Sequence, residues 1–153
     1  MSNEEIFIRL GVALVLGMII GFERIYNGHD AGMRTHGILS MGACLFIIVA
    51  IFSAKEFSIG DSEIIRTIGQ IITGVGFLCG GLIFMSNKDN HKKGLTSAAT
   101  LWATSAIGAA CGFGYLGLAG IATAFIFFTL TLLGKIEWGM LKILGKYDAK
   151  KHK

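Results

Sequence analysis

Several side chains that could form a polar site lie in one short connection between two long apolar stretches. Glu23 ends the first stretch with Arg24 beside it, and Arg34, Thr35 and His36 begin the second. Opposite charges at the edge of an apolar region are partly removed from water, so they interact more strongly than a surface ion pair. We interpret this connection as a polar site or a partner-docking edge. The alternative is a clip that fixes the two flanking segments.

Two further polar stripes are predicted on helices. Arg66, Gln70 and Thr73 share one helical face because they are spaced by three and four residues. The second stripe consists of Thr96, Thr100 and Thr104. If the two stripes face each other, they would line a pathway for an ion. The alternative is that they form hydrogen bonds between neighbouring helices.

The sequence contains no arrangement typical of an enzyme or a metal centre. No nucleophile and base stand at motif spacing, and no phosphate-binding loop follows a strand. A divalent cation normally needs several oxygen ligands, including carboxylates, and the apolar stretches contain none. We therefore expect no catalysis, no cofactor and no bound metal. An enzymatic alternative would need Glu23 and His36 close enough to share a water molecule.

The composition indicates a protein that lies in a membrane. Hydrophobic residues make up 53% of the 153 residues, charged residues only 16%, and the mean hydropathy is +0.65. A single domain of this length cannot bury so much apolar surface in its own core. Four long neutral intervals separate the charged residues, at positions 10–22, 37–54, 67–87 and 94–134.

These intervals predict about five transmembrane helices in an all-α integral membrane protein. A helix needs roughly 20 residues to cross the hydrocarbon. The first interval reaches this length if residues 6–8 join it and Arg9 snorkels outward. The last interval is about twice too long for one crossing, and the glycine-rich stretch 112–117 divides it into two helices.

The distribution of positive charge predicts an external N-terminus and a cytoplasmic C-terminus. The net charge is +4, but the basic residues lie in connections and in the tail rather than among exposed aromatics, so we expect no nucleic-acid partner. Lysine and arginine are retained on the cytoplasmic side. With this orientation the inner side receives Arg24, Arg34, Lys88, Lys92, Lys93 and the six lysines of the tail.

Glycine pairs spaced four residues apart predict close contacts between helices. This spacing lets two helix backbones approach each other. We expect the first, third and fourth helices to be tightly packed, either inside one chain or in a self-association surface of a homo-oligomer. The pairs are Gly17 and Gly21, Gly76 and Gly80, and Gly108 and Gly112.

Residues 1–134 are predicted to form the membrane domain, and residues 135–153 a basic amphipathic cytoplasmic tail. Ile136, Met140 and Ile143 share one helical face, whereas Lys135 and Lys142 lie on another. This pattern is typical of a helix on the inner leaflet, where lysines meet anionic headgroups. The alternative is a direct extension of the fifth helix.

Several segments in order resemble the MgtC/SapB family. The resemblance runs in register from about Leu10 to the fifth helix, and several ordered blocks are far more specific than any one alone. The matching segments are LGMIIGFER at 16–24, AGMRTHG at 31–37, MGACLF at 41–46, IITGVGFLCGG at 71–81 and GLTSAATLW at 94–102.

The resemblance implies a bacterial inner-membrane protein of a family associated with low-magnesium adaptation and with survival inside host cells. It implies a regulator that acts on other membrane proteins, including the proton-translocating ATP synthase. The older label of magnesium transport accessory protein supports an alternative, a small channel or transporter for Mg²⁺ or another ion.

The resemblance also implies a set of functional positions. Long members of the family continue into a soluble cytoplasmic domain, whereas only the lysine-rich tail follows the membrane part here, so we expect the function to reside in the membrane part. The positions carried over by motif are Glu23, Arg24, Arg34, Thr35, His36, Gly76, Gly80, Thr96 and Trp102.

Overall fold

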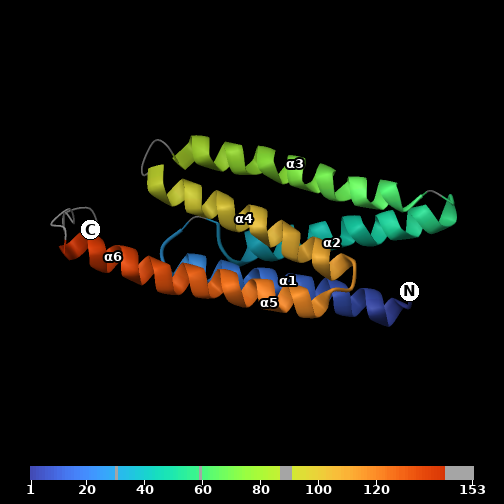
Figure 1. The fold of residues 1–153 in the computed structure, drawn as a ribbon, viewed down its shortest axis with the longest axis horizontal. Coiled ribbons are helices and arrows are strands. Elements are labelled where there is room, and N and C mark those ends of the chain that lie inside the picture. The colour runs from blue at the N-terminus through green and yellow to red at the C-terminus, as the bar shows by residue number, and fades with distance from the viewer. Residues whose placement is uncertain (30, 59, 87–90, 144–153) are drawn as a thin grey trace.

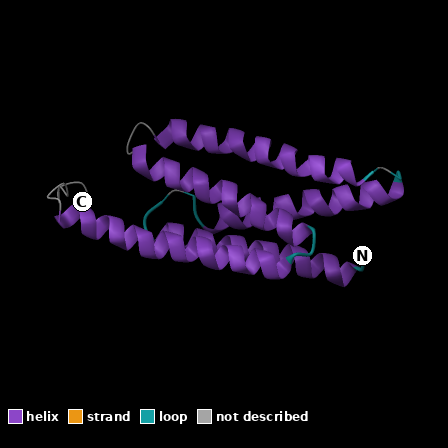
Figure 2. Ribbon diagram, viewed as in Figure 1, coloured by secondary structure: helices purple, strands orange, loops and turns teal. Residues whose placement is uncertain are grey.

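The computed structural model describes residues 1–143 except 30, 59 and 87–90, and over these residues it consists of helices joined by short connections. Figure 2 shows this all-helical architecture, and the predicted all-α class is confirmed. In chain order the elements are α1 (Asn3–Tyr26), α2 (Met33–Glu56), α3 (Asp61–Ser86), α4 (His91–Gly112), α5 (Leu116–Phe128), a π-helical segment η1 (Thr129–Leu133) and α6 (Gly134–Ile143).

The long helices lie side by side and alternate in direction (Figure 1). Towards one end of the bundle α1 and α3 finish, α2 and α4 begin, and α6 ends. The N-terminus and the starts of α3 and α5 lie towards the other end. The chain therefore runs along the bundle five times. Lys88 and the tail from residue 144 onward, on which part of the predicted orientation depends, lie outside the described residues.

Helix α4 is the most polar of the long helices and lies in the middle, in contact with α1, α2, α3 and α5. Within the described residues, four segments are long and apolar enough to cross a membrane, namely α1, α2, Asp61–Met85 and Leu116–Ile136. Because α4 packs against four other helices, its inward-facing polar side chains are enclosed by protein. Those side chains are buried, and they are Ser97, Thr100, Thr104 and Ser105.

The predicted break in the long fourth interval is a tight turn after α4. Gly114 adopts φ +86°, a conformation that glycine accommodates best. The Arg9 side chain was predicted to snorkel outward; its guanidinium donates a 2.6 Å hydrogen bond to the Gly112 carbonyl at the end of α4 and also pairs with Glu5, one turn nearer the N-terminus. The last carbonyls of a helix need hydrogen-bond donors, and a positive charge beside them interacts favourably with the negative end of the helix dipole.

Two of the three glycine pairs pack inside the chain as predicted. A Cβ at Gly17 would lie 2.5 Å from the His36 carbonyl oxygen, and one at Gly108 would lie 2.0 Å from the Ser40 carbonyl oxygen. Gly21 and Gly112 make similarly close approaches to α2. Only a residue without a side chain allows these approaches, so α1 and α4 are both held directly against α2.

The third pair, Gly76 and Gly80, does not pack within the chain. Among the described residues, no atom of another helix lies within 4 Å of the position that a Cβ would take at either glycine. The side of α3 that faces α4 is formed instead by Val75 and Cys79, which are both buried. Of the two alternatives for the glycine pairs, packing inside the chain therefore does not apply to Gly76 and Gly80, whose face of α3 points away from the bundle.

The end of the described chain is a continuous helical extension. Helix α5 passes through η1 into α6 without a break and ends at Ile143. Over the described residues, the fifth helix thus continues past residue 134. This is the second of the two alternatives given for that region. Figure 1 shows α5 lying along α1 and α6 continuing in the same direction past the end of α1.

Candidate functional site

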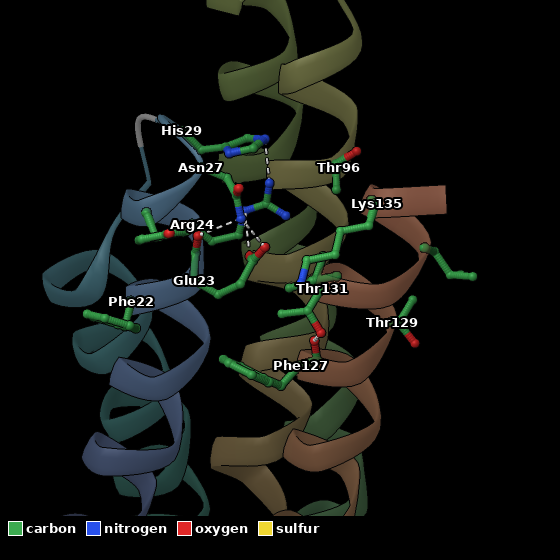
Figure 3. Close-up of a pocket in the computed structure, with 14 residues that line it drawn as sticks. Phe22, Glu23, Arg24, Asn27, His29, Thr96, Phe127, Thr129, Thr131 and Lys135 are labelled. Atoms are coloured by element: carbon green, nitrogen blue, oxygen red, sulfur yellow. Dashed lines mark hydrogen bonds and ion pairs between the residues drawn. The ribbon is translucent and has the colours of Figure 1, made fainter. Parts of the chain in front are cut away.

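A buried pair of opposite charges lies at the end of α1. Glu23 and Arg24 are only 4% and 3% exposed, and Arg24 Nε lies 3.6 Å from Glu23 Oε2. The Asn27 side-chain amide donates a 2.6 Å hydrogen bond to Glu23 Oε1, and Arg24 Nη2 contacts His29 Nε2. Figure 3 shows these four side chains gathered at the mouth of one cleft. Removing such a pair from water is costly unless further hydrogen bonds compensate for it.

The pair retains unused hydrogen-bonding capacity. Glu23 Oε2 and Arg24 Nε are buried, and neither has a hydrogen-bond partner among the described residues. The two atoms form an ion pair at 3.6 Å, but this distance is longer than a normal N–H···O hydrogen bond. Buried polar atoms in native proteins are nearly always satisfied, so this corner of the cleft can accept a polar ligand.

The cleft beside the pair has a volume of about 790 Å³ and is bounded by three parts of the chain. The end of α1 forms one wall, and η1 with its neighbours forms the opposite wall. The third part is the start of α4, from which Thr96 lines the cleft. In Figure 3 the Lys135 side chain extends from α6 towards the Glu23 and Arg24 side. The predicted residues Glu23, Arg24 and Thr96 are thus brought together, although they come from separate sequence segments.

A second polar contact links α2 to α4 inside the bundle. His36 is fully buried, and its Nδ1–H donates to the Gly32 carbonyl at 3.0 Å while Nε2 lies 3.3 Å from Thr100 Oγ1. Thr104 donates a 2.7 Å hydrogen bond to the Thr100 carbonyl. His36 and Thr100 therefore serve as a contact between helices. No hydrogen bond joins Glu23 to His36 in the part of the chain that the structure describes.

Other residues predicted for the first connection lie elsewhere. Arg34 and Thr35 are exposed at the start of α2. Glu23 pairs with its sequence neighbour Arg24 rather than with Arg34 at the start of α2. Arg24 also contacts His29 in the connection that follows α1. Trp102 is 49% exposed on the outer side of α4 and does not line the cleft.

The polar stripe of α3 faces away from α4. Arg66 is exposed and forms a 3.2 Å ion pair with Glu63, and Gln70 and Thr73 are exposed as well. Thr73 donates to the Gly69 carbonyl of its own helix at 2.9 Å. The two polar stripes therefore do not face each other within one chain, because apolar side chains of α3 occupy its contact with α4.

Sequence reasoning missed the second wall of the cleft. Thr129, Thr131 and Lys135 line it, and they lie on η1 or directly after it. The available signal was the two threonines of residues 129–133, followed by a lysine that we assigned to the tail. π-Helical turns are rare and occur frequently at functional sites, but the five residues of this one have no composition that predicts it.

The described residues contain no group of three His, Cys, Asp or Glu side chains that could hold a metal ion. The three cysteines, Cys44, Cys79 and Cys111, are free and buried inside the bundle. The polar site is thus built from an ion pair, amides, hydroxyls and a lysine. This chemistry suits binding of a charged or polar group.

Comparison with known proteins matches residues 10–138 to the MgtC family. Protein MgtC of Brucella abortus (strain 2308) is 40% identical over 124 residues, which cover 81% of this chain and 49% of that protein. Protein SrpB of Synechococcus elongatus is 37% identical over 140 residues, which cover 85% and 77% respectively. A protein of Escherichia coli (strain K12) named "Putative magnesium transporter YhiD" is 39% identical over 126 residues, which cover 77% and 56%.

The chain spans about half the length of the curated MgtC proteins that it matches. No solved structure matches it. The family match covers both walls of the cleft, from the end of α1 to η1 and Lys135, and all four helices that surround α4. By this match, and by its identity to proteins such as the Brucella MgtC, the chain belongs to the MgtC family.

Proposed function

We propose that this protein is a non-enzymatic regulator in the bacterial inner membrane, with its C-terminus in the cytoplasm, that acts by contact with itself and with other membrane proteins. Membership of the MgtC family supports a role linked to low magnesium or virulence, and a larger complex such as the ATP synthase is a candidate target. The basic connections at the end of the bundle where α1 finishes support the orientation. A reporter fused after Lys153 that is active only in the periplasm would contradict it.

The outward face of α3 is the observation that carries the proposal. Gln70, Thr73, Gly76 and Gly80 are all exposed on a helix that is otherwise apolar enough to cross a membrane. An amide facing lipid has no water to bond with and favours a partner in another helix. Small residues beside it allow that helix to approach closely. This face therefore fits the same face of a second copy.

Cysteine crosslinking in native membranes tests self-association. In a chain whose natural cysteines are replaced by alanine, Thr73→Cys is expected to give a disulfide-linked dimer. Phe125→Cys is the matched control, because Phe125 is 69% exposed on α5, outside the proposed face. Adding Gly76→Ile to Thr73→Cys is expected to reduce the dimer several-fold by holding the helices apart. Equal crosslinking at positions 73 and 125, or monomer alone, would contradict the proposal.

Transport of Mg²⁺ is the second candidate, and the printed name of the Escherichia coli relative favours it. The polar stripes of α3 and α4 do not face each other in one chain, and residues 37–54, 67–87 and 94–134 contain no carboxylate to replace the water of the ion. These observations favour regulation. Magnesium flux into proteoliposomes containing only this protein would decide for transport instead.

A further inference from the structure

The cleft described above continues into an apolar groove. The groove has a volume of about 390 Å³ and shares Phe22 and Phe127 with the cleft. Its remaining lining is Val15, Met18, Ile19 and Met33. From Val15 to Phe22 it follows α1 for roughly 10 Å, given a rise of 1.5 Å per residue. A charged compartment therefore opens directly into a hydrocarbon-lined one.

The charged compartment carries a surplus of positive charge. The charged residues that line it are Glu23, Arg24 and Lys135, so one cation remains after the ion pair is counted. Arg24 Nε is a buried donor without a hydrogen-bond partner among the described residues. Arginine donates to phosphate in a geometry that matches its oxygens, and lysine adds a mobile point charge. The compartment thus fits one phosphate group.

The position of the site in the bundle selects a lipid rather than a soluble phosphate. The polar compartment lies at the end of the bundle where α1 finishes, and the groove runs from it towards the middle of α1. A phospholipid has this same order, with its headgroup at the membrane surface and its acyl chains inside. A free phosphate would leave the apolar groove unused.

The π-helical segment shapes the wall opposite α1. Thr129, Leu130, Thr131 and Leu133 of η1 all line the cleft, and Lys135 follows directly. A π turn adds a residue and shifts the register of the side chains that follow. Figure 3 shows Thr129, Thr131 and Lys135 along this wall, with the Lys135 side chain extended towards the ion pair.

We propose that this protein binds an anionic phospholipid between α1 and the η1–α6 segment, with the phosphate beside Arg24 and Lys135 and an acyl chain along the groove of Met18, Ile19, Phe22 and Phe127. The site is separate from the outward face of α3, so it does not depend on self-association.

Native mass spectrometry of the full chain in detergent tests the site. The protein is offered equal amounts of phosphatidylglycerol and phosphatidylcholine, and we expect phosphatidylglycerol to be retained preferentially. Lys135→Gln is expected to reduce that retention about fivefold, the effect of one lysine on an anionic lipid. Lys55→Gln is the matched control, because Lys55 is an exposed lysine at the opposite end of the bundle. It should leave retention unchanged.

A second variant separates a lipid from a bare phosphate. Ile19→Trp fills the groove without touching the charged residues, so it should reduce phosphatidylglycerol retention, and inorganic phosphate should not displace the lipid. Equal retention of the two lipids, or equal effects of Lys135→Gln and Lys55→Gln, would overturn the proposal. Displacement by inorganic phosphate, together with unchanged binding in Ile19→Trp, would show a phosphate site and would also overturn it.

Discussion

Replacing Gly108 by alanine is expected to lower the free energy of unfolding of the bundle by about 3 kcal/mol, at the upper end of the usual cost of overpacking. The new Cβ would lie 2.0 Å from the Ser40 carbonyl oxygen, which belongs to the backbone of α2 and cannot turn aside like a flexible side chain. Helices α2 and α4 would have to separate, and the contact between His36 and Thr100 would weaken with them.

Denaturation in detergent micelles, followed by circular dichroism, measures this effect. Gly42→Ala is the matched control, because Gly42 also lies within a long helix and no atom of the described residues outside its own turn comes within 4 Å of an added Cβ. The control should shift the free energy of unfolding by less than about 1 kcal/mol, as the change in helix propensity implies. Identical unfolding of the two variants would mean that α2 and α4 are not held together at Gly108.

The glycine spacing predicted close approach but not the partner. Gly108 and Gly112 meet α2, whereas Gly76 and Gly80 have the same spacing and face outward. Spacing determines only that two glycines share a helix face. Which face turns inward is decided by the rest of the helix, and in α3 Val75 and Cys79 occupy the inner side. A pattern within one helix therefore cannot distinguish intrachain packing from a surface for a second chain.

The helices were predictable from the sequence because each neutral interval is long enough to cross a membrane. The central position of α4 follows from its polarity, since its buried hydroxyls need neighbouring helices rather than lipid. The site was predicted only in part. Glu23, Arg24 and Thr96 carried a signal, but the wall that contains Lys135 depends on how α5 lies along α1 and on a π turn. No local residue pattern specifies either feature.

Removal of Arg24 is expected to cost more than the loss of its own contacts. Arg24→Met leaves Glu23 buried without a positive partner, and breaking a buried ion pair in this way typically costs about 3–5 kcal/mol. Arg66→Met is the matched control, because the Arg66–Glu63 pair also lies within one helix but is exposed. An exposed pair contributes less than about 1 kcal/mol. Unfolding in the same micelles measures both variants.

The double variant Glu23→Gln/Arg24→Met separates the charge effect from packing. If the cost arises from an unpaired carboxylate, neutralising Glu23 should recover most of the stability lost in Arg24→Met, because a glutamine of the same shape can still accept from Asn27. If the cost arises from the lost volume and contacts of the arginine, the double variant should be at least as unstable as the single one. A double variant more stable than the wild type would show in addition that the ion pair is retained at a net cost in desolvation, which is the state expected of a site that holds charge ready for a ligand.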